Sequence, residues 1–312
     1  MQFRKFGKLT WQASALGFGC MRFPLQGEKS SNIDVEQASK MLAYAINNGV
    51  NYLDTAYGYH GGQSEIFVGN FLKNGYRDKV KIATKMPTWL TKRKSDFDKY
   101  LDEQLEKLQT AHIDFYLLHG LNRNRWQKLL ELNVLEWAEK SISNGRIGNL
   151  GFSFHDDYET FKEIIDTYDN WSLAQIQYNY MDIENQAGTR GLRYAASKGL
   201  AVIIMEPILG GRLTNPPESI MGLWNSAEHE RTPADWALQW IWDQPEVSIV
   251  LSGMSDMKQV EENVASATRS GISTLLMDEL KLVAEVRDKY KQLSPIPCTK
   301  CEYCLPCPSG VN

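Results

Sequence analysis

The chain has 312 residues, of which 43% are hydrophobic and 23% charged, values typical of a globular protein with a large core. Its 34 basic and 38 acidic residues give a formal net charge of −4, which provides no global attraction for nucleic acid or an anionic membrane surface. No run of 18 apolar residues occurs, and the amino terminus lacks the apolar core of a secretory signal. We therefore expect a cytoplasmic protein with neither a membrane nor a nucleic-acid partner.

Short apolar runs recur along the chain, and a stretch with helical periodicity follows each of them. The eight runs are 16–20, 50–55, 80–85, 113–119, 147–153, 173–178, 200–206 and 248–252. Alternating strands and helices predict a parallel sheet, and eight such units predict a closed (β/α)8 TIM barrel over residues 1–294. An open doubly wound sheet is the alternative, but no GxGxxG follows the first run.

Helix signals lie between these runs. Asp34 precedes a periodic apolar stretch that ends at Asn48-Gly49, so a helix should begin directly after this aspartate. Leu101, Leu105 and Leu108 fall on one face of a predicted helix, as expected for a helix packed against a sheet. Similar patterns predict helices over 157–166 and 256–266.

Four polar residues lie at the ends of the second, third and fourth runs or directly after them, at the strand ends where barrel enzymes place their chemistry. They are Asp54, Tyr59, Lys85 and His119. Reduction of a carbonyl requires a hydride on carbon and a proton on oxygen, and a tyrosine can supply the proton. A nearby lysine favours the phenolate, an aspartate keeps the lysine charged, and a histidine can hydrogen-bond the substrate oxygen. Each residue alone also has a structural explanation, but the set predicts a carbonyl reductase.

The segments NYLDTAYGYHGGQSE, KIATKMP and IDFYLLHG resemble the catalytic segments of the aldo-keto reductase superfamily in order and spacing. The resemblance covers about residues 2–290 and implies that Tyr59 donates the proton. It assigns Asp54 and Lys85 to tuning this tyrosine and His119 to orienting a small-molecule carbonyl substrate. An NAD(P)H-dependent oxidoreductase is the implied function. A nucleotide-sensing regulatory protein, as potassium-channel β subunits resemble, and an electron-transfer protein are alternatives.

The same resemblance implies where a nicotinamide cofactor binds. LGFSFHDD matches a motif whose Ser-Asn pair holds the carboxamide, with Ser153 in place and Phe154 at the asparagine position. Gln175 matches a glutamine that contacts the same group, and Met205 stands where the family usually has an aromatic ring. The other implied cofactor-binding residues are Gly19, Met21, Pro207, Gly210, Gly211, Arg212, Ser252, Gly253, Ser255, Gln259 and Asn263.

Two parts of this set bear on the phosphates. Gly210-Gly211-Arg212 can approach the pyrophosphate, although the glycines can equally serve the loop conformation. In LSGMSDMKQVEEN, which resembles the site for the adenosine half, Gly253 and Gln259 stand where lysine and arginine often contact a 2′-phosphate. Hydroxyls and helix-start amides can still bind a phosphate, so we expect NADP(H), with NAD(H) as the alternative.

Four cysteines crowd into the tail, residues 295–312. Cys298, Cys301, Cys304 and Cys307 give C-x₂-C-x₂-C-x₂-C-P, one residue short of the bacterial ferredoxin run. Such close thiolates favour a 4Fe-4S iron–sulfur cluster, with zinc and unliganded thiols as alternatives. With YHGGQSE and MEPILGG, the tail resembles the ferredoxin-type branch of the aldo-keto reductases, which implies an electron-transfer partner. Members of that branch usually continue into a second cysteine motif, so we expect a truncated iron–sulfur segment.

Overall fold

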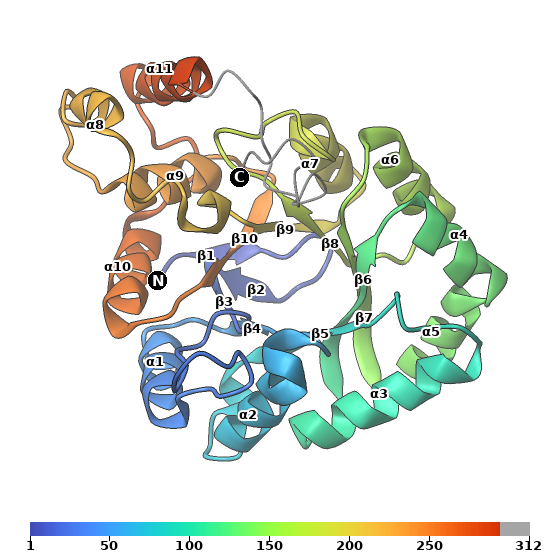
Figure 1. Cartoon of the computed structure of the whole chain (residues 1–312). Helices are drawn as coiled ribbons and strands as arrows, with labels where there is room; N and C mark the ends of the chain where they lie inside the picture. Colours follow the sequence, from blue (N-terminus) through green and yellow to red (C-terminus); the bar gives the residue numbers. More distant parts are fainter. Residues whose placement is uncertain (294–312) are drawn as a thin grey trace, which may run out of the picture.

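The computed structural model describes residues 1–293, in which eight parallel strands close into a barrel ringed by helices (Figure 1). Around the barrel the strands are β3 (Leu16–Gly19), β4 (Tyr52–Asp54), β5 (Lys81–Met86), β6 (Ile113–Leu121), β7 (Ile147–Phe154), β8 (Leu173–Gln177), β9 (Ala201–Met205) and β10 (Val247–Gly253). Pairing of β10 with β3 closes the ring. Each predicted run overlaps one of these strands, so the predicted (β/α)8 barrel is confirmed.

Helices connect the strands and cover the outside of the barrel (Figure 1). They are α1 (Val35–Asn47), α2 (Gln63–Leu72), α3 (Ser95–Leu108), α4 (Arg123–Glu131), α5 (Val134–Ser143), α6 (Tyr158–Thr167), α7 (Gly188–Ser197), α8 (Glu218–Trp224), α9 (Pro233–Trp242), α10 (Met257–Arg269) and α11 (Met277–Leu293). Side chains of Asp34, Asp157 and Asp256 accept backbone N–H groups at the starts of α1, α6 and α10. These caps fix the helix starts where the sequence predicts them.

A short hairpin that the sequence did not reveal closes the amino-terminal end of the barrel. Strand β1 (Phe3–Lys5) pairs antiparallel with β2 (Gln12–Ser14). Phe6 follows β1 and packs on Phe115 inside the barrel, with ring centroids 4.8 Å apart. Three-residue strands are too short to show an alternating pattern, so this hairpin carries little sequence signal.

The barrel interior changes from apolar to polar along its axis. Because successive strand side chains point to opposite faces, residues two apart share the inner face. The inner apolar layer, packed around Phe6, includes Tyr52, Ala83, Phe115 and Leu173. Two residues further along their strands lie Asp54, Lys85, Leu117 and Gln175, and His119 follows Leu117 at the same spacing. The polar side chains thus gather at the carboxyl ends of the strands.

Two further predictions concern membrane spans and a metal site. No helix within residues 1–293 is long and apolar enough to cross a membrane. The predicted metal ligands Cys298, Cys301, Cys304 and Cys307 lie outside the described residues. Within residues 1–293, no group of three or more His, Cys, Asp and Glu side chains is placed to hold a metal ion.

Candidate active site

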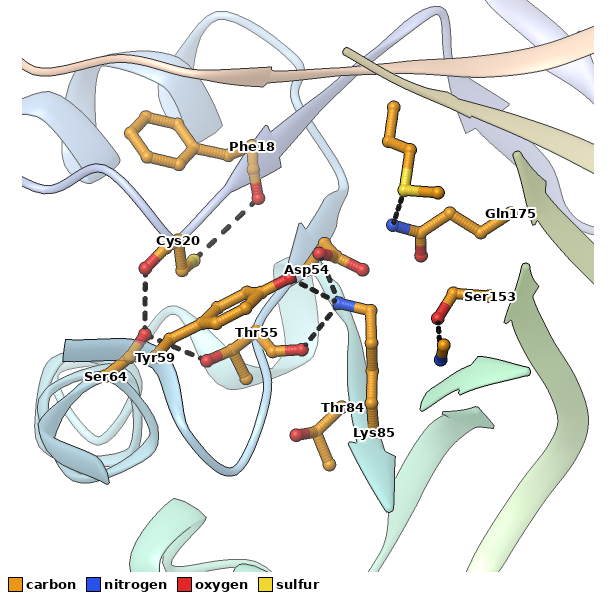
Figure 2. Close-up of polar contacts among 12 residues, drawn as sticks. Phe18, Cys20, Asp54, Thr55, Tyr59, Ser64, Thr84, Lys85, Ser153 and Gln175 are labelled. Atoms are coloured by element: carbon orange, nitrogen blue, oxygen red, sulfur yellow. Dashed lines mark hydrogen bonds and ion pairs between the residues drawn. The ribbon is translucent and has the colours of Figure 1, made fainter. Parts of the chain in front are cut away.

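Lys85 is the centre of a buried polar cluster at the carboxyl ends of β4 and β5 (Figure 2). Its Nζ lies 2.6 Å from Asp54 Oδ1, 2.9 Å from the carbonyl oxygen of Thr55 and 3.3 Å from the Tyr59 hydroxyl. An ammonium group has three N–H donors, so these acceptors occupy all of them. The Tyr59 oxygen accepts one of these bonds, and its own proton therefore remains free for another acceptor.

Tyr59 reaches Lys85 through a tight turn after β4. It is the first residue of the 3₁₀ turn Tyr59–Gly62, in which His60 has a left-handed φ of 53°. This conformation is uncommon for a non-glycine residue and persists only where contacts hold it. His60 Nε2 accepts the backbone N–H of Phe23 at 3.2 Å, and Nδ1 lies 2.7 Å from the carbonyl oxygen of Ser30. The turn that presents Tyr59 is thereby fixed to the loop after β3.

The charge of Lys85 depends on its partners. Burial lowers the pKa of Lys85, but the Asp54 carboxylate and the Tyr59 oxygen outweigh this effect, and the net pKa is raised. The side chain is therefore an ammonium ion at neutral pH. Removal of the Asp54 carboxylate would leave this charge buried and uncompensated, which is strongly unfavourable.

The protonation of Tyr59 depends on its burial as well as on the neighbouring lysine. Burial raises the pKa of Tyr59 above its usual value of 10, and Lys85, which acts in the opposite direction, offsets only part of this increase. The phenol therefore stays protonated at neutral pH. Lys85 favours the phenolate, as the sequence predicts, but the sequence does not show the depth of burial, which has the larger effect on the pKa of Tyr59. A protonated phenol is the form that can donate a proton.

His119 lies on β6 next to Tyr59, two residues before the strand ends rather than at its end as predicted. The Tyr59 and His119 rings are 6.1 Å apart and nearly perpendicular, and Trp89 packs on the histidine at 5.1 Å. Burial, together with the positive charge of Lys85, lowers the pKa of His119 well below 6.5. The imidazole is thus neutral at pH 7, and its buried Nδ1 has no partner within residues 1–293. A neutral imidazole can donate one hydrogen bond.

Three predicted cofactor residues lie on the inner face of the next strands. Ser153 Oγ accepts the backbone N–H of Gly120 at 2.7 Å, and Gln175 Nε2 lies 3.7 Å from the Met205 sulfur (Figure 2). Gln175 Oε1 is buried and has no hydrogen-bond partner in the described part of the chain. A buried unpaired acceptor is costly, and a bound amide N–H donor would satisfy it. These side chains therefore fit the carboxamide of a nicotinamide.

Phe154 cannot take the place of the asparagine found in related motifs. Its side chain is fully buried and packs on Phe161 of α6, with ring centroids 5.0 Å apart. It therefore belongs to the core between the barrel and its helices. One amide contact expected from the motif is missing at this strand end.

The loop after β9 carries several predicted phosphate-contacting residues. Gly210 and Gly211 both have left-handed φ angles, of 64° and 98°, so the loop conformation itself requires glycine. Arg22, which the sequence analysis missed, reaches this loop: its Nη2 lies 3.6 Å from the position of a Cβ at Gly210. The Arg22 side chain also passes 3.2 Å from a Cβ placed at Gly253. This exposed guanidinium lies between the two loops, and its place just after the first strand end was the clue to it.

The other predicted residues of this group differ in their exposure. Gly19 packs tightly on β10, where a Cβ would lie 3.2 Å from the Ser252 carbonyl oxygen. Met21 and Arg212 are exposed, whereas Pro207 is buried.

The start of α10 is already hydrogen-bonded. Asn263 Nδ2 donates to Ser252 Oγ at 3.0 Å. The Gln259 side chain folds back, accepting the Ser255 backbone N–H at 2.9 Å and donating to Asp256 Oδ2 at 2.7 Å. Asp256 also accepts the backbone N–H of Gln259 at 2.9 Å. A phosphate bound here would therefore have to displace the glutamine and lie near a carboxylate.

Comparison with known proteins agrees with this geometry. A model of the Aldo/keto reductase family matches residues 15–281. L-galactose dehydrogenase of Arabidopsis thaliana is 28% identical, with 94% of this chain and 97% of that protein aligned. NADH-specific methylglyoxal reductase of Escherichia coli is 25% identical over 76% of this chain and 84% of its own. An aldo-keto reductase of Bacillus halodurans in its holo form superposes with a TM-score of 0.76 and 26% identity, covering 92% of this chain and 96% of its own. The chain therefore belongs to the aldo/keto reductase family and is an NAD(P)H-dependent oxidoreductase.

Proposed function

We propose that the protein reduces an aldehyde or ketone to the alcohol, with Tyr59 as the proton donor. One observation carries this proposal: Lys85 uses its three donors on Asp54, Thr55 and Tyr59, so that the phenol proton is free for a substrate oxygen. Bound NAD(P)H supplies the hydride for the carbonyl carbon.

The neighbouring residues stabilise the charge that develops as the phenol loses its proton. The Tyr59 oxygen becomes anionic 3.3 Å from the Lys85 ammonium, which Asp54 holds in place. His119, neutral at pH 7, donates a hydrogen bond to the carbonyl oxygen and orients it toward Tyr59. Solvent returns the proton to Tyr59 after the product leaves.

We assign the cofactor to the strand ends of β7 to β10 and of β3, which pairs with β10, and to the loops that follow these strands. Ser153 and Gln175 hold the nicotinamide carboxamide, and the unpaired Gln175 Oε1 supports this role. Met205, whose sulfur lies 3.7 Å from Gln175 Nε2, would pack on the nicotinamide ring through this polarizable atom. Arg22 and Arg212 compensate the charge of the diphosphate. The remaining assigned contacts are Gly19, Met21, Pro207, Gly210, Gly211, Ser252, Gly253, Ser255, Gln259 and Asn263.

We propose NADP(H) as the cofactor, with only a small preference over NAD(H). The Ser255 hydroxyl and the first amides of α10 can bind a 2′-phosphate, but Asp256 opposes it. Gln259 stands where a basic residue often contacts the phosphate. In addition, a relative that is 25% identical is named as NADH-specific. The preference should therefore amount to less than about tenfold in affinity, because a charge-assisted phosphate contact is missing.

Other classes of function are less well supported. A protein that only senses nucleotide has no use for a free phenol proton beside a buried ammonium ion. An electron-transfer role depends on the cysteines outside the described residues, and their spacing alone supports a 4Fe-4S cluster. Iron and acid-labile sulfide measured on protein purified without oxygen would test it, and stoichiometric zinc without sulfide would contradict it.

Isotope transfer tests the proposed reaction. The protein is incubated with a panel of aldehydes and ketones and with NADPH that carries deuterium at the transferable position of its nicotinamide. We expect the alcohol product of at least one carbonyl to carry the deuterium on the former carbonyl carbon. Cofactor oxidation without label in any product would contradict carbonyl reduction.

A further inference from the structure

Glu65 is a fully buried carboxyl group that the proposed reaction does not use. It lies in the first turn of α2, which begins directly after the turn that carries Tyr59. Its Oε1 accepts hydrogen bonds from Thr84 Oγ1, at 2.6 Å, and from Gln104 Nε2. Thr84 directly precedes Lys85 on β5, so Glu65 joins the segment of Tyr59 to the strand of Lys85.

Gln104 of α3 completes this connection. Its Nε2 lies 3.1 Å from the backbone carbonyl oxygen of Lys85 and 3.0 Å from Thr84 Oγ1. Its Oε1 accepts the Tyr116 hydroxyl at 2.7 Å. Glu65, Thr84, Gln104 and Tyr116 are all fully buried. The amide orientation of Gln104 is therefore fixed, and it holds the backbone at Lys85 as well as the carboxyl of Glu65.

Burial of the Glu65 carboxylate costs desolvation free energy, and the neighbouring donors and Lys107 offset only part of this cost. Burial raises the pKa of Glu65, against the hydrogen bonds from Thr84 and Gln104 and the charge of Lys107, whose Nζ is 3.7 Å from Oε2. An apolar side chain at this position would avoid the desolvation cost. A role other than stability would explain why a carboxyl is present.

We propose that Glu65 is a positioning residue, which fixes the Tyr59 hydroxyl relative to the Lys85 ammonium by tying α2 to β5. The preceding residue supports this view, because Ser64 Oγ lies 2.9 Å from Thr55 Oγ1 and donates to the Cys20 carbonyl oxygen at 3.0 Å (Figure 2). The first turn of α2 is thus bonded to the ends of β3 and β4 through Ser64 and to β5 through Glu65. The effect on catalysis rests on the proposed function.

The proposed tie requires a hydrogen-bond acceptor rather than a charge. Glu65→Gln retains an oxygen that can accept from Thr84 and Gln104, so it should preserve the arrangement. Glu65→Leu keeps a similar volume but leaves the buried Thr84 hydroxyl without its acceptor and removes one of the acceptors of Gln104 Nε2. Thr84→Val removes one donor with almost no change of shape and should have an intermediate effect.

Asp235 provides a matched control. It is also a buried carboxylate, which accepts from a glutamine, Gln239, at 3.0 Å and from a cation, Arg269, at 3.2 Å. Its bonds join α9 to α10 and do not reach β4 or β5. Asp235→Leu should therefore lower stability as Glu65→Leu does, while kcat stays at the parent value.

Two measurements on these variants test the inference. We expect Glu65→Leu to lower kcat at least about tenfold, with the KM for NADPH within about twofold, because misplacement of the acid affects the chemical step. Glu65→Gln should retain kcat within about threefold. The second measurement is the pH titration of the Tyr59 phenol by ¹⁹F NMR, in protein labelled with 3-fluorotyrosine and without substrate. Tyr59→Phe assigns the resonance.

The titration makes the inference independent of activity. Displacement of Lys85 should raise the Tyr59 pKa in Glu65→Leu by about one unit, and in Glu65→Gln by much less. An unchanged titration in folded Glu65→Leu would overturn the positioning role, even if the parent reduces carbonyls. A shifted titration in a protein that reduces no carbonyl would retain that role and refute the proposed function. If Glu65→Leu does not fold, Thr84→Val decides, and no shift in that variant would count against the inference.

Discussion

The two halves of the barrel opening are built differently. On the side of β4 and β5, a buried ion pair between Lys85 and Asp54 lies at 2.6 Å, and all three lysine donors are used within the chain. On the side of β7 to β10 the inner side chains Ser153 and Gln175 are an uncharged hydroxyl and an uncharged amide. There Gln175 Oε1 is unpaired within residues 1–293, and Gln259 bonds only to the start of its own helix.

This difference separates two tasks. The proposed acid must have its geometry and charge set before substrate arrives, because catalytic stabilisation is effective when no reorganisation is needed. A cofactor site must instead exchange its ligand, so its groups can remain partly unpaired until binding. Variants on the first side should therefore change the rate of the reaction, and variants on the second side should change cofactor affinity.

Replacement of Lys85 should have the largest effect. In Lys85→Met the Asp54 carboxyl remains buried without its cation, and we expect about 3 kcal/mol less stability in urea unfolding. The value of kcat should fall by about a hundredfold or more, since the stabilising charge beside Tyr59 is lost. The double variant Lys85→Met with Asp54→Leu should regain stability without regaining activity. Recovery of activity in the double variant would mean that the ion pair has only a structural role.

The pH dependence of kcat should report the raised pKa of Tyr59 and the lowered pKa of His119, which lie next to each other. In the proposed reaction Tyr59 acts in its protonated form, and burial raises its pKa above 10, so kcat should fall only as pH rises above 10. In the proposed reaction His119 acts in its neutral form, and its pKa is lowered well below 6.5, so activity should be lost only as pH falls well below 6.5. A rate profile with an essential group titrating between pH 7 and 9 would contradict both assignments.

Gln175 tests the opposite side. Gln175→Leu removes the unpaired acceptor that we assign to the carboxamide, and the Kd for NADPH should rise about tenfold, the range of one buried hydrogen bond. Fluorescence titration measures this affinity directly. The value of kcat at saturating cofactor should stay within about threefold of the parent. A fall in kcat with unchanged Kd would remove the distinction between the two sides.

The smallest expected effect is on cofactor choice. Gln259→Arg places a cation at the start of α10, where Asp256 now accepts from the glutamine. The preference for NADPH over NADH in Kd should increase about fivefold to tenfold through a charge-assisted contact with the 2′-phosphate. Gln259→Met controls for loss of the glutamine bonds. An equal gain in affinity for both cofactors would mean that the 2′-phosphate of NADPH does not bind at the start of α10.

The sequence allowed prediction of features that depend on local pattern. Strands, aspartate helix caps and strand-end residues each depend on a few consecutive residues. The barrel could therefore be predicted, as could the proximity of Asp54, Tyr59, Lys85 and His119. The direction of the Tyr59 pKa could not, because it depends on burial by distant segments. Arg22 was missed because its approach to Gly210 depends on how two loops meet in three dimensions.

A single-turnover experiment with Tyr59→Phe tests the central claim most directly. Parent and variant are saturated with NADPH, mixed rapidly with a carbonyl that the parent reduces, and followed by the loss of NADPH absorbance. We predict that the variant binds NADPH with a Kd within about twofold of the parent but oxidises it at least about a hundredfold more slowly, the contribution expected of a positioned general acid. Oxidation at the parental rate in the variant would show that Tyr59 is not the proton donor.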